Sequence, residues 1–139
     1  MTNSSQVFHD KAIESGKELR KIIVSLSTGI LAIFFLALTR EIKPLLQPLE
    51  KIILILSISL FSVSIFSGII AWFIDSNRYY FMAKAKEASE KKEDQEKTKY
   101  KKKFKVFEIL RVFTDIFLFI PFFSGIVVSA IFLVLRIDF

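Results

Sequence analysis

Three long apolar runs that contain almost no charge dominate the pattern of the chain. They span residues 22–39, 52–74 and 116–135, and each is bounded on both sides by a basic or acidic residue. The hydrocarbon core of a bilayer needs about 20 apolar residues in a helix that rises about 1.5 Å per residue, and each run is close to that length. Because backbone groups in hydrocarbon must be paired within their own segment, the pattern predicts three transmembrane helices.

The rest of the chain leaves no room for a second domain. The chain has 139 residues, and outside the runs it holds an N-terminal segment (1–21), a short loop and a long charged segment (76–111). None of these parts is large enough to bury a soluble core. We therefore expect an all-α membrane protein with one membrane domain over residues 1–139. No small-residue cleavage site follows the first run, so we expect it to stay as a signal anchor.

Basic residues are distributed unevenly around the three runs. Of the 20 Lys and Arg residues, twelve lie between residues 76 and 111 and four in segment 1–21, which we expect to be an amphipathic helix, whereas the C-terminal tail has one. Loops rich in Lys and Arg stay on the cytoplasmic side. The count predicts a bacterial inner-membrane protein with a cytoplasmic N-terminus and charged segment, and with its C-terminus outside.

The charged segment has the composition of a long helical hairpin. It contains no Gly or Pro, and Ala, Glu, Lys and Gln, which favour helix, are frequent in it. We expect the second and third helices to extend into the cytoplasm and to pack as a coiled coil along apolar positions at helical spacing. The expected pairs of this seam are Phe81 with Phe107, Ala85 with Phe104, and Ala88 with Tyr100.

This register places the turn of the hairpin near Asp94. The residues around it, KKEDQE, include no turn-forming Gly or Pro. A disordered tip is therefore the alternative to a closed hairpin.

Four charged residues stand at the cytoplasmic boundary of the second and third runs: Asp75, Arg78, Arg111 and Asp115. Arg111 and Asp115 are four residues apart, and Asp75 and Arg78 are three apart. The two members of each pair therefore lie on the same face of a helix. Charges at the edge of a bilayer are costly and are usually paired or functional. We interpret the four as an interfacial ion-pair group, with gating or proton relay as the alternative.

Small residues recur at helical spacing in all three runs. Such stripes let helix backbones approach closely, and serine can donate a hydrogen bond across the contact. They predict helix-packing or oligomer interfaces at Ser25, Gly29, Ala32, Ser57, Ser64, Gly68, Ala71, Gly125 and Ser129. Five serines crowd the second run, so a serine-lined water path is the alternative, but around the helix they are spread rather than aligned.

The residues required for catalysis or for binding a metal or cofactor are scarce. The chain has no cysteine and one histidine, His9, and it carries no phosphate-binding glycine loop or nucleophile motif. We expect no enzyme activity, no metal and no cofactor.

The many lysines of the charged segment indicate contact with anionic lipids on the cytoplasmic side. The residues expected to make it are Lys99, Lys101, Lys102, Lys103 and Lys105. We expect no nucleic-acid partner, because the aromatic positions nearby belong to the hairpin seam.

The sequence GKELRKIIVSLSTG, which opens the first span, and the short loop that leads to the second resemble small multi-pass bacterial inner-membrane proteins. Some members of that group are encoded beside phage-defence genes and act as membrane-disrupting effectors. The resemblance implies an oligomerising membrane protein: a permeabilising effector, or a small channel gated through the cytoplasmic hairpin. The alternative is a non-conducting anchor or structural subunit that recruits a partner protein through the charged hairpin.

Overall fold

Three long α-helices account for nearly all of the described chain in the computed structural model, which describes residues 4–39, 46–91 and 94–137. Helix α1 runs from Ser4 to Thr39, α2 from Pro48 to Glu90 and α3 from Asp94 to Ile137. Each helix is long and apolar enough to cross a membrane, as the three apolar runs predicted. The predicted all-α class, with three helices long and apolar enough to span a membrane, is therefore confirmed.

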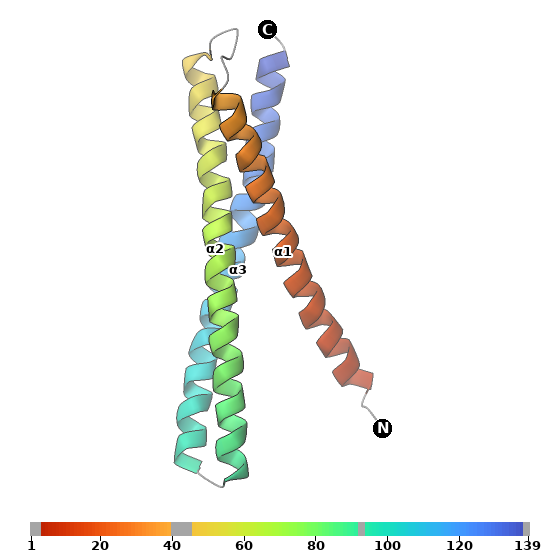
Figure 1. Ribbon diagram of the computed structural model, residues 1–139, viewed down its shortest axis with the longest axis vertical. Coiled ribbons are helices and arrows are strands. Elements are labelled where there is room, and N and C mark those ends of the chain that lie inside the picture. The colour runs from red at the N-terminus through yellow and green to blue at the C-terminus, as the bar shows by residue number, and fades with distance from the viewer. Residues whose placement is uncertain (1–3, 40–45, 92–93, 138–139) are drawn as a thin grey trace.

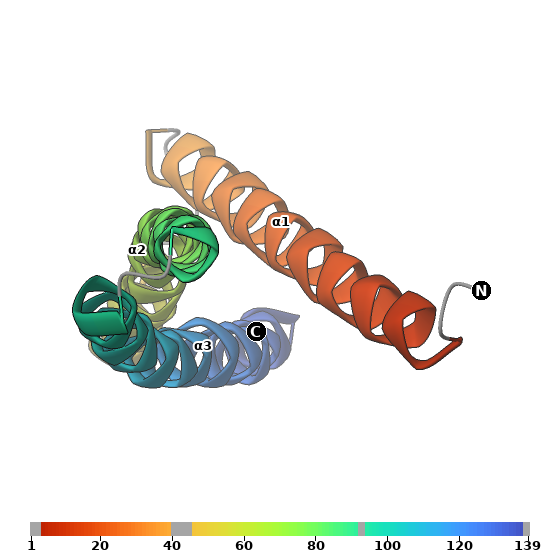
Figure 2. The same ribbon diagram turned by 90° about the horizontal axis from the view of Figure 1, so that it is seen from below.

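Helices α2 and α3 lie side by side in opposite directions along their length, whereas α1 packs against them near its C-terminal end and then diverges (Figures 1 and 2). The beginning of α1 lies toward the same end of the molecule as the end of α2 and the beginning of α3. Beyond the apolar runs α2 and α3 continue without a break, and we call residues 76–111 the charged arm.

Local sequence accounts for where α2 begins and for the continuity of α1. Pro48 is the first residue of α2, where its missing N–H costs nothing, and the Glu50 carboxylate accepts a hydrogen bond of 2.7 Å from the Gln47 backbone N–H. Helix α1 passes through Gly16, so the segment 1–21 and the first span are parts of one helix over the described residues. The first loop falls largely on residues 40–45, outside the described residues.

Most buried residues of α2 between positions 54 and 75 recur at alternating spacings of three and four residues. They are Leu54, Ser57, Phe61, Ser64, Gly68, Ala71 and Asp75, and Ser67 and Ile74 are buried next to this stripe. This is the spacing at which side chains of one helix insert between those of its neighbour in a coiled coil. Phe61 and Leu118 are completely buried and form the centre of the core, together with Ile23 from α1 and Phe122 from α3.

The register of the two helices differs from the prediction in one respect. Asp94, expected near the centre of the turn, is the first residue of α3, and the turn falls on Lys91 and on residues 92–93, outside the described residues. Phe81 contacts the ring of Phe107 at a centroid distance of 5.4 Å and also that of Tyr100 at 6.4 Å. Phe81 therefore sits between two side chains rather than opposite one, as interlocked packing requires.

The register makes a test by disulfide formation possible because the chain has no cysteine of its own. Ser129 Oγ donates to Ser57 Oγ at 3.4 Å, so we expect Ser57→Cys with Ser129→Cys to cross-link under a membrane-permeant oxidant. Ser59→Cys with Ser129→Cys is the matched control, because Ser59 is exposed and donates to the Ile55 carbonyl of its own helix. Equal yields for the two pairs, measured by gel mobility, would contradict this register.

Candidate functional site

Five charged side chains from all three helices meet where the apolar runs end. They are Arg20 from α1, Asp75 and Arg78 from α2, and Arg111 and Asp115 from α3, and we call them the charge cluster. The structure brings together all four residues that the sequence placed at this boundary. It adds Arg20 of α1.

Arg111 is the centre of the cluster. Its Nε donates to Asp75 Oδ1 at 2.8 Å and its Nη1 donates to Asp115 Oδ1 at 2.7 Å, so one guanidinium joins α2 to α3. The residue is only 4% exposed. A planar guanidinium can bind two carboxylates at once, and a lysine ammonium does this less well. An arginine therefore fits the position better than a lysine.

Arg20 attaches α1 to the same two carboxylates. Its Nε and Nη2 donate to the two oxygens of Asp115 at 3.0 and 3.3 Å, and its Nη1 donates to Asp75 Oδ2 at 3.4 Å. Arg78 Nη1 donates to Asp75 Oδ1 at 3.3 Å. Each aspartate is thus shared by two or more arginines, and the cluster carries three positive and two negative charges.

The contact of Arg20 also determines which face of α1 turns inward. Positions three, seven and fourteen residues after Arg20 lie on its face, and these are Ile23, Ser27 and Phe34, which pack inward. The predicted interface residues of α1 lie elsewhere on the helix and are exposed: Ser25, Gly29 and Ala32. Of the two roles predicted for them, helix packing or an oligomer interface, the second is the one that suits exposed residues, and it stays a prediction.

The small residues of α2 and α3 do make close helix contacts. A side chain at Gly68 would overlap Val24 of α1, and one at Gly125 would come within 3.0 Å of the Phe61 ring. Ala71, Ser57 and Ser64 are fully buried, and Ser129 is partly buried. These positions therefore serve packing inside one chain.

Two buried serines of α2, Ser57 and Ser64, are hydrogen-bonded to α3. Ser64 Oγ donates to the Leu118 carbonyl at 2.9 Å, close to Pro121, whose ring interrupts the hydrogen bonding of α3. Ser57 pairs with Ser129, and Phe61 fills the space between these two levels. Over the described residues the middle of the bundle is therefore an apolar layer.

A second charged layer lies at the opposite end of the apolar runs. Glu50 of α2 is buried, and Arg136 of α3 approaches its Oε2 at 3.5 Å. About 25 residues of α2 and 21 of α3 separate this layer from the charge cluster, which corresponds to roughly 31–38 Å at 1.5 Å per residue. That spacing is close to the thickness of the hydrocarbon core, about 30 Å.

Aromatic and basic side chains share the charged arm. Ala88 of the expected seam is buried, Phe81 lies between Tyr100 and Phe107, and Ala85 and Phe104 line one groove. The five lysines expected to contact lipid are all exposed: Lys99, Lys101, Lys102, Lys103 and Lys105. Lys103 Nζ also lies 5.2 Å above the Phe81 ring.

The end of α2 carries a local group of charges. Lys84 and Lys91 both donate to the Glu87 carboxylate at 2.9 Å, and these bonds hold the pKa of Glu87 down to about 2. The same contact raises the pKa of Lys84. Glu87 therefore stays ionised across the physiological range, and the group helps to keep this exposed end of α2 helical.

Sequence reasoning missed Arg20 and the contact of Glu50 with Arg136. The signal for Arg20 was present, because it stands within one turn of the first apolar run, as Asp75 does for the second. Lys17 and Lys21 occupy similar positions, however, and only the orientation of α1 in the fold selects Arg20 among the three.

The charge cluster should contribute strongly to stability. Replacing Arg111 with Leu removes the most buried partner of Asp75 and Asp115, and we expect this to lower the free energy of unfolding by about 3–5 kcal/mol. Replacing Lys21 with Leu removes an exposed ion pair with Glu18 and should change it by less than about 1 kcal/mol. Loss of helicity in mixtures of mild detergent and dodecyl sulfate measures both. Similar effects of the two substitutions would show that the cluster is not a stabilising contact.

The charge cluster holds the three helices together. Among the described residues, no group of three or more His, Asp or Glu side chains is placed to hold a metal ion. Comparison of the chain with protein families, with curated proteins and with solved structures finds no match.

Proposed function

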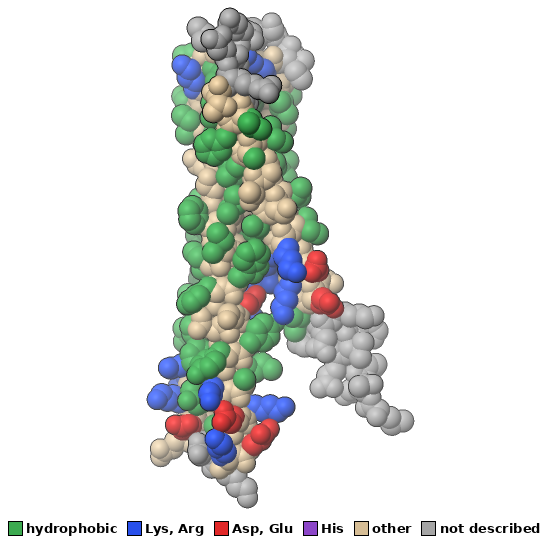
Figure 3. Space-filling model, viewed as in Figure 1, with side chains coloured by type: hydrophobic (Ala, Val, Ile, Leu, Met, Phe, Trp, Pro, Cys, Tyr) green, Lys and Arg blue, Asp and Glu red, His purple; other side chains and the backbone are tan. Residues whose placement is uncertain are grey.

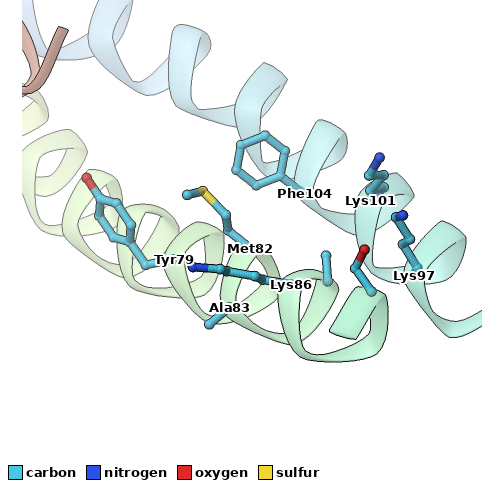
Figure 4. A pocket seen from close by; sticks show the side chains of 9 residues that line it. Tyr79, Met82, Ala83, Lys86, Lys97, Lys101 and Phe104 are labelled. Atoms are coloured by element: carbon cyan, nitrogen blue, oxygen red, sulfur yellow. The ribbon is translucent and has the colours of Figure 1, made fainter. Parts of the chain in front are cut away.

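We propose that the protein is a non-conducting membrane anchor that recruits a partner protein through the charged arm. One observation carries this proposal: a groove of about 670 Å³ on the arm (Figure 4). Met82 and Ala83 from α2 and Phe104 from α3 give it an apolar floor. Three lysines also line it: Lys86, Lys97 and Lys101. We call this the arm groove.

The chemistry of the arm groove indicates the kind of partner. Its lining includes three lysines and no carboxylate, and apart from Ser89 its walls are otherwise apolar or aromatic. An amphipathic helix places apolar anchors in such a groove while its flanking carboxylates pair with basic residues at the edge. The occupant that fits is an amphipathic helix with acidic flanks.

The distance of the arm groove from the bilayer favours a protein over a lipid. Lys86 lies eleven residues beyond Asp75 and Lys97 eighteen before Asp115, so these lysines of the groove are roughly 16–27 Å from the charge cluster, whereas Tyr79 and Met82 lie nearer to it. Lipid headgroups extend only about 5–8 Å beyond the hydrocarbon core. The basic part of the groove is therefore reached from solution.

The membrane placement is part of the same proposal. The excess of basic residues on the charged arm supports a cytoplasmic hairpin and N-terminus, with the C-terminus outside a bacterial inner membrane. The helical continuity of α2 and α3 from the spans into the arm would hold the groove at a fixed height above that membrane.

Charge reversal tests whether the binding of a partner depends on the lysines of the arm groove or on the overall positive charge of the arm. We expect Lys86→Glu with Lys97→Glu and Lys101→Glu to abolish cross-links from a photoreactive residue placed at Met82 to a cytoplasmic protein. The matched control reverses Lys99, Lys102 and Lys105, which are exposed and outside the groove. Cross-links that survive in the first variant, or vanish equally in both, would contradict docking in the groove.

A second function is favoured by one further observation. The face of α1 that carries Ser25, Gly29 and Ala32 is uncovered, and nothing lies within 4 Å of a side chain added at Gly29. Small residues on an open face suit close packing with another copy. This supports the proposal that the protein forms oligomers. In this second function the oligomer is a permeabilising effector of the phage-defence kind, or a small channel gated through the arm.

Mass measurement in nanodiscs tests the second function. If α1 forms the interface, Gly29→Leu should shift the protein from oligomer to monomer, because the larger side chain separates the backbones by several ångströms. Phe35→Leu, at another exposed position of α1, is the control and should leave the oligomer intact. A wild-type monomer would contradict this function. Gly68→Leu would not test an interface between chains, because Gly68 packs against Val24 within one chain.

A further inference from the structure

A cleft of about 820 Å³ opens where α1 diverges from the charged arm. Ile13 and Lys17 from α1, Arg78 and Met82 from α2, and Phe104 from α3 are among the residues that line it. Figure 3 shows basic and acidic side chains gathered together at this place, where α1 separates from the other two helices. We call it the α1 cleft.

The α1 cleft lies at the height of lipid headgroups. Arg78 and Met82 are three and seven residues beyond Asp75, which places them roughly 5–10 Å past the end of the apolar run. The headgroup layer on each side of a bilayer is about 5–8 Å thick. A ligand that enters this cleft from the membrane therefore presents its headgroup first.

Two positive groups of the cleft have spare capacity. Within the described residues Arg78 makes one hydrogen bond, from Nη1 to Asp75, and its guanidinium lies 5.4 Å from the Phe104 ring with 27% of the side chain exposed. The charge cluster to which Arg78 belongs has one positive charge in excess. Lys17 Nζ lies 4.6 Å from the centre of the Tyr79 ring, which holds the ammonium at the cleft without neutralising it. A phosphate would complement both groups.

Two negative groups of the same cleft also lack partners among the described residues. Glu18 is paired with Lys21 at 3.2 Å, but Glu14 and Glu108 enter no ion pair or hydrogen bond there. A ligand with only negative charge would be repelled by these carboxylates. A ligand with only positive charge would be repelled by Lys17 and Arg78. The lining therefore selects a ligand that carries both signs.

We propose that the α1 cleft binds the headgroup of one ethanolamine phospholipid. Its phosphate pairs with Arg78 and Lys17, and its primary ammonium donates hydrogen bonds to Glu14 and Glu108. A choline headgroup carries both charges but has no N–H to donate, and a glycerol headgroup has no positive charge. Leu19 and Ile22, exposed on α1 beside the cleft, offer apolar surface to the acyl chains. Tyr79, Met82 and Phe104 line both the α1 cleft and the arm groove, but the four charged residues that hold the headgroup line the cleft and not the arm groove.

Native mass spectrometry of the full chain tests the proposal directly. The delipidated protein in mild detergent is mixed with equal amounts of phosphatidylethanolamine, phosphatidylglycerol and phosphatidylcholine. We expect one ethanolamine lipid to be retained about fivefold more than either competitor, because only its ammonium can donate hydrogen bonds to the two exposed carboxylates. Equal retention of the three lipids, or a preference for phosphatidylglycerol, would overturn the assignment.

Substitutions of the residues that contact the two ends of the headgroup test the ammonium and the phosphate interactions separately. Glu14→Gln with Glu108→Gln should remove the preference for ethanolamine over choline, while Lys17→Gln should weaken retention of all three lipids. Glu90→Gln with Glu96→Gln is the matched control, because both residues are exposed on the arm and do not line the cleft. Unchanged helicity verifies the fold of each variant. A preference for ethanolamine that survives in the first variant would refute the role of the carboxylates.

Discussion

The constraint on which this structure depends is that Arg111 must be neutralised where it meets the bilayer. A guanidinium that is almost fully buried cannot stay charged without partners, and Asp75 and Asp115 provide them from two helices. Because Arg20 joins the same carboxylates, one group of charges fixes the height and the rotation of all three helices. The apolar layer of Phe61 and Leu118 then packs on helices whose positions are already restricted.

Much of the fold follows from the sequence by elementary rules. The lengths of the three apolar runs predicted the spans, and the lack of Gly and Pro between residues 69 and 120 predicted that α2 and α3 continue into a charged arm. The stripe of Ser57, Ser64, Gly68 and Ala71 predicted the packed face of α2. These features depend on the period of a single helix, which one sequence reveals.

The parts that could not be predicted depend on how one helix is rotated or shifted against another. The small face of α1 was expected to pack, but the ion pairs of Arg20 turn it outward and bury Ile23 and Ser27 instead. The register of α2 and α3 differs slightly, because Phe81 lies between two rings rather than opposite one. Both outcomes arise from contacts between residues far apart in the sequence, for which a periodic pattern carries no information.

The two charged layers have a consequence for the membrane itself. The charge cluster and the pair of Glu50 with Arg136 are held a fixed distance apart by continuous helices, so the protein has a nearly constant hydrophobic length. A bilayer of different thickness has to thin, thicken or let the bundle tilt, at a cost of a fraction of a kcal/mol per ångström of mismatch. Hydrophobic mismatch would therefore sort this protein toward membranes whose thickness matches its own.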